Sequence, residues 1–183
     1  ADVNLIEQYY GTGLIDGVTT NPTLIKKSGY DPEEVYRKIA LLGVDDISME
    51  IVTDDSYEFL KEGRRLKEKF GEITTIKVPC TPEGLKACKL LSKEGIRVNV
   101  TLIFSAAQAV LASKAGAAYV SPFVGRVDDN SFDGLRLIEE IANIYETQSR
   151  LYNFVDTEIL SASIRNVGSV SKSFEYGAGI VTM

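Results

Sequence analysis

Short β-branched segments alternate with longer amphipathic segments along most of the chain. The short segments have the length and composition of buried strands, whereas the longer ones repeat their apolar residues at helical spacing. The predicted strands are residues 14–21, 47–52, 73–79, 98–104, 119–124, 158–164 and 180–183. This alternation of strand and helix is typical of an α/β protein in which crossover helices join parallel strands.

Capping residues and glycines mark where the predicted helices begin and end. Asp31-Pro32-Glu33 and Thr81-Pro82-Glu83 each place a capping side chain before a proline of the first turn, and Ser105 with Gln108 forms a capping box. Glycines typical of helix ends are Gly29, Gly43, Gly71, Gly95 and Gly116. Because no Pro- or Ser-rich linker interrupts the pattern, we expect residues 1–183 to form one domain.

Two architectures fit this pattern, a (β/α)-barrel and a doubly wound open sheet. A nucleotide-type glycine fingerprint opens none of the strand-to-helix turns, which weakens the second option. We therefore predict a (β/α)8 TIM barrel in which seven strands are visible and which is truncated at both ends.

Polar residues interrupt the apolar strands near their carboxyl ends. Strand alternation places the members of each pair on one face. The pairs are Thr19 with Asn21, Ser48 with Glu50, Asn99 with Thr101, Ser121 with Phe123, and Ser163 with Arg165, and Lys77 is added from a sixth strand. In a barrel these groups converge on one cavity, because barrel chemistry occurs at the carboxyl ends of the strands. The alternative is that each residue turns out to solvent at the end of its strand.

Lys77 and Glu50 are the candidate reactive groups. Lys77 lies between Ile76 and Val78, so we expect a partly desolvated amine suited to Schiff-base formation; the alternative is a surface lysine that extends its amine to water. Glu50 between apolar neighbours suggests a general acid/base acting through water, or else a structural ion pair with a lysine. Thr101 could hold that water, although threonine is also simply a good strand former.

Arg126 and Arg165 follow two strands late in the chain. The loops after the last strands of a barrel commonly bind phosphate, and a guanidinium matches phosphate oxygens bidentately. We expect the two residues to bind an anion; the alternative is a pair of solvent-exposed arginines.

Composition narrows the function further. A net charge of −6 argues against a nucleic-acid partner, and the absence of histidine excludes a histidine-based triad and a histidine-ligated zinc site. Cys80 and Cys88 have no partners at metal-ligand spacing, so we expect no metal and no disulfide. With no apolar run long enough for a membrane span and no signal peptide, we expect a cytoplasmic protein that makes no membrane contact.

Five further motifs are residues 17–23 (GVTTNPT), 76–79 (IKVP), 99–105 (NVTLIFS), 119–126 (YVSPFVGR) and 162–166 (ASIRN). Together they resemble the small transaldolase family, which also contains fructose-6-phosphate aldolases. The resemblance implies a class I aldolase-type barrel that transfers a dihydroxyacetone unit between sugar phosphates without a cofactor. It also implies a homo-oligomer.

The resemblance assigns roles to individual residues. Lys77 matches the Schiff-base lysine, and Glu50 matches a position that carries Glu in transaldolases and Gln in the aldolases. Phe123 likewise matches transaldolases, since the aldolases carry Tyr there. The remaining matches are Thr19, Asn21, Thr101 and Ser121 around the dihydroxyacetone unit and catalytic water, and Arg126, Ser163 and Arg165 around the phosphate. From the strand pattern, Asn99 is a further substrate-binding candidate.

Two departures from the family pattern concern the ends of the chain. Family members usually have a first strand before the segment that matches residues 1–3, and this strand carries an Asp that transfers a proton; Asp2 does not replace that residue. Family members also continue past the position of Met183 into a closing helix. We therefore expect weak or no transaldolase activity from these 183 residues alone. The alternatives are a fructose-6-phosphate aldolase and a non-catalytic sugar-phosphate-binding remnant.

Overall fold

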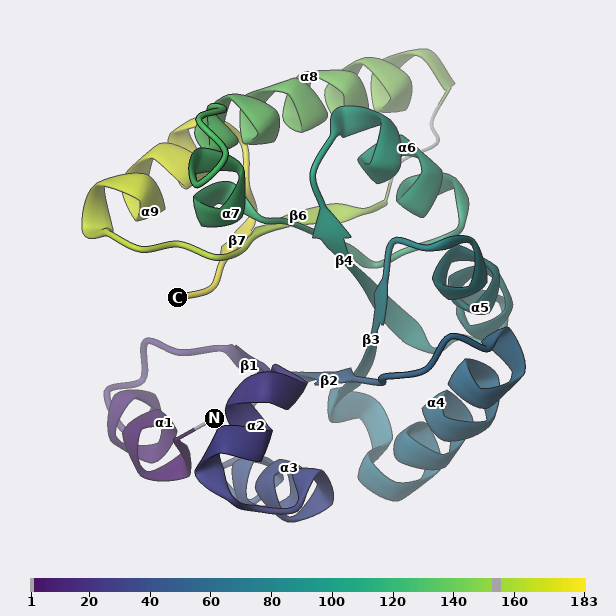
Figure 1. Ribbon diagram of the computed structural model, residues 1–183, viewed down its shortest axis with the longest axis vertical. Helices are drawn as coiled ribbons and strands as arrows, with labels where there is room; N and C mark the ends of the chain where they lie inside the picture. The colour runs from purple at the N-terminus through teal and green to yellow at the C-terminus, as the bar shows by residue number, and fades with distance from the viewer. Residues whose placement is uncertain (1, 153–155) are drawn as a thin grey trace.

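A curled sheet of parallel strands forms the centre of the molecule. The computed structural model describes residues 2–152 and 156–183, and within them seven strands pair in the order β1 to β7. The strands are β1 (Gly17–Thr19), β2 (Asp46–Glu50), β3 (Thr74–Pro79), β4 (Arg97–Ile103), β5 (Tyr119–Pro122), β6 (Glu158–Ser161) and β7 (Ile180–Val181). Each strand pairs in parallel with the next one along the chain, and the sheet curls as in a (β/α)8 barrel (Figure 1), which confirms the predicted fold class.

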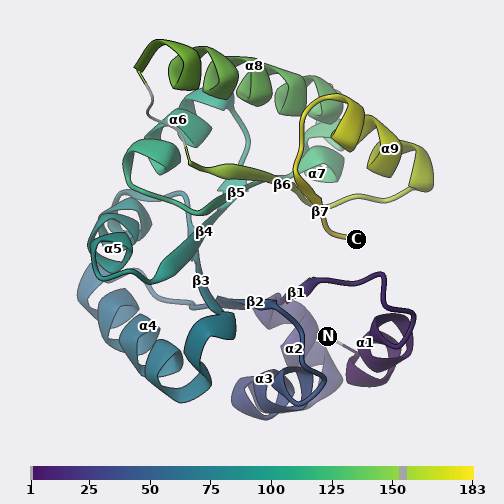
Figure 2. The same cartoon turned by 180° about the vertical axis from the view of Figure 1, so that it is seen from behind.

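Helices surround the outside of this sheet (Figure 2). They are α1 (Val3–Tyr10), α2 (Pro22–Ser28), α3 (Pro32–Ala40), α4 (Ser56–Phe70), α5 (Pro82–Lys93), α6 (Ala106–Lys114), α7 (Val124–Asp128), α8 (Gly134–Tyr152) and α9 (Val167–Glu175), with a short 3-10 turn η1 (Gly71–Ile73). The predicted caps are confirmed, since Asp31, Thr81 and Ser105 each accept a backbone N–H of the first helical turn.

Side-chain alternation divides the interior into two regions. Alternate residues such as Met49, Ile76 and Val100 lie in the core between sheet and helices. Their neighbours along each strand therefore face the concave side of the sheet. On that side, Phe123 and Leu160 form a smaller apolar cluster with Ala162, whereas β2 to β4 contribute polar side chains.

The curl leaves β1 and β7 as the two edges of the sheet among the described residues, as the sequence predicted. Figure 1 shows both chain ends beside the opening between these edges. The Oγ1 atoms of Thr19 and Thr182 nevertheless lie 2.8 Å apart. One side-chain hydrogen bond thus connects the carboxyl ends of the two edge strands.

Asp46 lies on the concave side of the sheet, at the amino-terminal ends of the strands. Its Oδ2 accepts from Thr75 Oγ1 at 2.6 Å and from the Tyr119 hydroxyl at 3.4 Å, and lies 3.1 Å from Arg97 Nη2. Burial raises the pKa of Asp46, although these hydrogen bonds and the Arg97 charge act in the opposite direction. This cluster links the four strands β2, β3, β4 and β5 at the end of the sheet opposite the candidate site.

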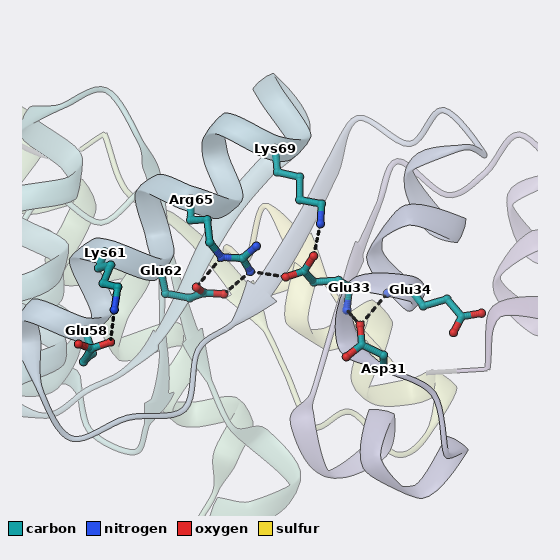
Figure 3. A network of polar contacts seen from close by, with 8 residues as sticks. All are labelled: Asp31, Glu33, Glu34, Glu58, Lys61, Glu62, Arg65 and Lys69. Atoms are coloured by element: carbon teal, nitrogen blue, oxygen red, sulfur yellow. Dashed lines mark hydrogen bonds and ion pairs between the residues drawn. The ribbon is translucent and has the colours of Figure 1, made fainter.

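An ion-pair network joins α3 to α4 on the surface (Figure 3). Glu33 of α3 accepts from both Arg65 and Lys69 of α4, and Arg65 also pairs with Glu62 at 2.7 Å. The pKa of Glu33 is lowered, chiefly by its hydrogen bond to Lys69 and then by that to Arg65. Exposed pairs of this kind contribute little to stability, so the network mainly fixes how α3 packs beside α4.

The buried hydroxyl of Thr74 allows a stability prediction. Thr74 is fully buried at the start of β3, and its Oγ1 has no hydrogen-bond partner among the described residues. Replacing it by valine removes an unsatisfied polar group and keeps the shape, so we expect Thr74→Val to raise the free energy of unfolding by about 1 kcal/mol. Urea denaturation measures this change. The matched variant Thr75→Val should instead lower the free energy of unfolding, because Thr75 donates to Asp46. A Thr74→Val variant less stable than the original protein would show that the Thr74 hydroxyl does have a partner.

Candidate active site

Lys77 and Glu50 lie side by side on the concave face. They are paired in the register of β2 with β3, and Ile76 and Val78 on either side of the lysine point to the helices. Lys77 Nζ lies 2.8 Å from Glu50 Oε2, and the two side chains are only 7% and 16% exposed. The lysine is therefore buried inside the curl, and the alternative of a surface lysine does not hold.

The lysine amine has a second partner in the main chain. Nζ donates to the carbonyl oxygen of Thr20, just beyond β1, at 2.9 Å. Toward Glu50 the contact is purely an ion pair, because among the described residues Oε2 has no donor in hydrogen-bond geometry. That oxygen can therefore still accept a hydrogen bond, as a proton-transfer group requires.

Asn99 and Ser121 lie next to this pair. Asn99 is the register partner of Lys77, and it donates from Nδ2 to Ser48 Oγ at 3.2 Å. Ser121 Oγ donates in turn to Asn99 Oδ1 at 2.8 Å. All three polar residues are at most 1% exposed, so they form a fixed polar surface beside the amine.

Thr101 occupies an unusual stretch of β4. Its Oγ1 is buried and has no hydrogen-bond partner among the described residues. The next residue, Leu102, has a φ of 59°, and the register with β5 shifts between Val100 and Ile103. Such a bulge re-aims side chains near functional sites, and an unpartnered hydroxyl here is available to a water or substrate.

Arg126 follows β5 on the short helix α7. Its guanidinium lies 4.9 Å from the ring centre of Phe123, which packs edge to face on Phe104 at 5.9 Å. Arg126 also lines a surface hollow of about 570 Å³ formed with the first turns of α6 and α8. The arginine is exposed, and its guanidinium lies over the Phe123 ring at a distance typical of a cation–π contact.

Arg165 and Ser163 lie in the loop after β6 and pack against α7. Arg165 donates from both terminal nitrogens to the carboxylate of Asp129, which lowers the pKa of Asp129. A Cβ on Gly125 would lie 2.3 Å from the Ser163 carbonyl and 2.7 Å from Arg165 Nε, so only glycine allows this packing. The Arg165 guanidinium in this loop therefore already binds an anionic group, the Asp129 carboxylate.

Thr19 and Asn21 lie at the end of β1. Thr19 contacts Thr182, whereas Asn21 caps α2 by accepting the Leu24 N–H at 3.2 Å. The predicted strand 14–21 is too long, because β1 spans Gly17–Thr19, although the backbone of Asn21 is still extended. The predicted strand 158–164 is also too long, because β6 ends at Ser161, and the φ of 60° at Ser163 breaks the alternation expected for Ser163 with Arg165.

Two functional groups escaped the sequence reasoning. The Thr20 carbonyl binds the lysine amine, although alternation points the Thr20 side chain away from the site. Asp129 binds Arg165 across 36 residues of sequence. A main-chain acceptor leaves no mark in the residue pattern, and such a long-range pairing can be seen only in the folded chain.

The described residues contain no group of three or more Cys, Asp or Glu side chains that could hold a metal ion. In the same part of the chain, no helix is both long and apolar enough to cross a membrane.

The arrangement defines a class of protein: a (β/α)-barrel with a buried lysine–carboxylate pair at the carboxyl ends of its strands and arginines on the loops that follow. The model of the transaldolase/fructose-6-phosphate aldolase family matches residues 1–183, and the chain belongs to this family.

Curated relatives of this chain are named as probable transaldolases. A probable transaldolase from Ruegeria pomeroyi is 49% identical over 182 residues, covering 100% of this chain and 81% of the relative. Probable transaldolases from Nitrosopumilus maritimus and Methanococcus vannielii are 45% and 48% identical over 183 residues, covering all of this chain and 80% and 82% of their own lengths. These relatives support the transaldolase interpretation over the alternatives.

Among solved structures, a mandelate oxidase variant has a TM-score of 0.59 at 18% identity, covering 80% of this chain and 51% of that one. The chain thus spans about half the length of this structural neighbour. The likeness concerns the fold alone.

Proposed function

We propose that this chain carries the active site of a transaldolase, in which Lys77 forms a Schiff base with a ketose phosphate. The observation that supports the proposal most directly is the buried Lys77–Glu50 pair, with Nζ and Oε2 2.8 Å apart. A buried amine beside a carboxylate combines the nucleophile with its proton acceptor. Resemblance to the family further favours a cytoplasmic homo-oligomer in the pentose phosphate pathway.

In the proposed reaction, Lys77 first passes a proton to Glu50, directly or through a water. The neutral amine adds to the C2 carbonyl of the ketose phosphate, and loss of water, with a proton from Glu50, gives the iminium ion. Cleavage of the C3–C4 bond then moves its electron pair into an enamine and releases an aldose phosphate. The proton of the C4 hydroxyl leaves to a general base as this bond breaks.

The enamine completes the transfer by adding to the carbonyl carbon of a second aldose phosphate. The new alkoxide takes up a proton, and hydrolysis of the iminium ion releases the new ketose and restores Lys77. We assign Asn99 and Ser121 to the dihydroxyacetone hydroxyls, and we assign Thr101, whose hydroxyl has no partner among the described residues, to the water that enters and leaves. We assign the phosphate to Arg126, Ser163 and Arg165.

Borohydride trapping tests the proposal. Incubation with fructose 6-phosphate and borohydride should add a reduced dihydroxyacetone unit or hexose phosphate to Lys77, located by peptide mass spectrometry. Binding of the sugar phosphate without any lysine adduct would instead support a non-catalytic sugar-phosphate-binding protein.

Fructose-6-phosphate aldolase is the second candidate, because the matching family model describes both activities. Glu50 favours transaldolase by resemblance, and a carboxylate is a stronger proton acceptor than an amide. We expect Glu50→Gln to lower the transfer rate by about 100-fold and to shift the remaining products toward free dihydroxyacetone. Product ratios from coupled assays measure the shift. Unchanged ratios would show that position 50 does not separate the two activities.

A further inference from the structure

Thr20 reaches the candidate site with its main chain only. Its carbonyl oxygen accepts from Lys77 Nζ at 2.9 Å, in a setting where Lys77 is 6% and Thr20 1% exposed. The amine is thus held from one side by a neutral main-chain acceptor and from the other by the Glu50 carboxylate.

The side chain of Thr20 lies on the opposite face and anchors this carbonyl. Thr20 N and Oγ1 both donate to the Ser48 carbonyl of β2, at 3.0 and 2.7 Å. From the helix layer, burial raises the pKa of the Tyr36 hydroxyl of α3, and its interaction with the Thr20 side chain acts in the opposite direction.

A fixed carbonyl at this position constrains how the amine can react. A carbonyl oxygen can only accept hydrogen bonds, so one N–H of Lys77 stays directed at Thr20 when the lysine loses its proton. The lone pair then points away from Thr20, into the space next to Glu50. Holding a nucleophile in one orientation lowers the entropy cost of attack, and small displacements are expensive.

We propose that Thr20 is a positioning residue for Lys77, acting through the hydroxyl that anchors its own carbonyl. This inference rests on the proposed Schiff-base function of Lys77 and adds a residue outside the concave face to the machinery.

The test compares two substitutions at one position. Thr20→Val keeps the carbonyl and the side-chain shape but removes the anchoring hydroxyl, whereas Thr20→Ser keeps the hydroxyl. We expect Thr20→Val to lower kcat and the rate of borohydride-trapped adduct formation at Lys77 by about tenfold, with KM unchanged. Thr20→Ser should restore both rates to within about twofold of the original protein.

Thr74→Val is the matched control, because it is the same change at a buried threonine whose hydroxyl has no partner among the described residues. It should leave both rates unchanged. Circular dichroism and phosphate binding show whether each variant is folded, and Thr20→Ala carries the same expectation should the valine variant not fold.

The outcomes separate this inference from the function on which it rests. Normal adduct formation with equal rates in Thr20→Val and the original protein overturns the positioning role alone. Equal losses in Thr20→Val and Thr20→Ser also overturn it, because packing rather than the hydroxyl would then matter. Absence of a Lys77 adduct in the original protein overturns the proposed function itself.

Discussion

Replacing Lys77 by methionine should eliminate turnover and the borohydride adduct together. Methionine matches the length of the lysine side chain to within about one heavy atom but cannot form an imine, so we expect kcat to fall by a factor on the order of 10⁴ or more. The substrate's phosphate should still bind, because Arg126 and Arg165 are unchanged. Coupled kinetics and intact mass after trapping measure the two effects.

The same substitution should also destabilise the fold. Glu50 would remain largely buried without the cation 2.8 Å away, and breaking one side of such a pair costs about 3 kcal/mol. The double variant Lys77→Met with Glu50→Gln removes both charges, so it should recover most of the lost free energy of unfolding while staying inactive.

The surface residue Lys172 supplies the control. It pairs with Glu175 on the outside of α9, and Lys172→Met should keep both activity and adduct. An adduct that persists in Lys77→Met, or that disappears in Lys172→Met, would assign the reactive amine to another lysine. Residual activity above one part in about 10³ in Lys77→Met would argue against imine catalysis altogether.

The sequence predicted the part of the site that lies on regular strands. In β2 to β5, apolar residues such as Ile76 and Val98 alternate strictly with Lys77 and Asn99, and burial of the former fixes the direction of the latter. The alternation rule therefore placed Glu50, Lys77, Asn99, Thr101 and Ser121 on one face.

The rule failed where strands ended earlier than their β-branched residues suggested. β1 ends at Thr19, and Asn21 caps α2 by accepting a first-turn N–H. Ser163 turns to a positive φ so that its carbonyl can accept the Gly125 N–H at 3.1 Å. The turn at Ser163 depends on contacts between α7 and the loop after β6, which no local pattern contains.

Replacing Arg165 by alanine should weaken the binding of phosphorylated substrates while sparing the chemistry. The fork of Arg165 holds the Asp129 carboxylate with both terminal nitrogens, and the same geometry matches two oxygens of a phosphate. Loss of a charge-assisted bidentate contact should raise KM for fructose 6-phosphate by about 30- to 100-fold, with kcat changed less than about threefold. Initial-rate kinetics with phosphorylated and unphosphorylated ketoses separate the two effects.

Arg64→Ala is the matched control for this prediction. Arg64 also forms a two-point contact with a carboxylate, Glu94, at 2.6 and 2.8 Å, but on the outer helices, so its loss should leave KM unchanged. In Arg165→Ala the pKa of Asp129 should rise toward its ordinary value, because the hydrogen bond to Arg165 is the main cause that lowers it. An NMR titration that shows this rise without any change in KM would establish that Arg165 serves Asp129 rather than phosphate. Equal weakening for fructose and fructose 6-phosphate would also contradict the assignment, because only the phosphate should depend on the fork.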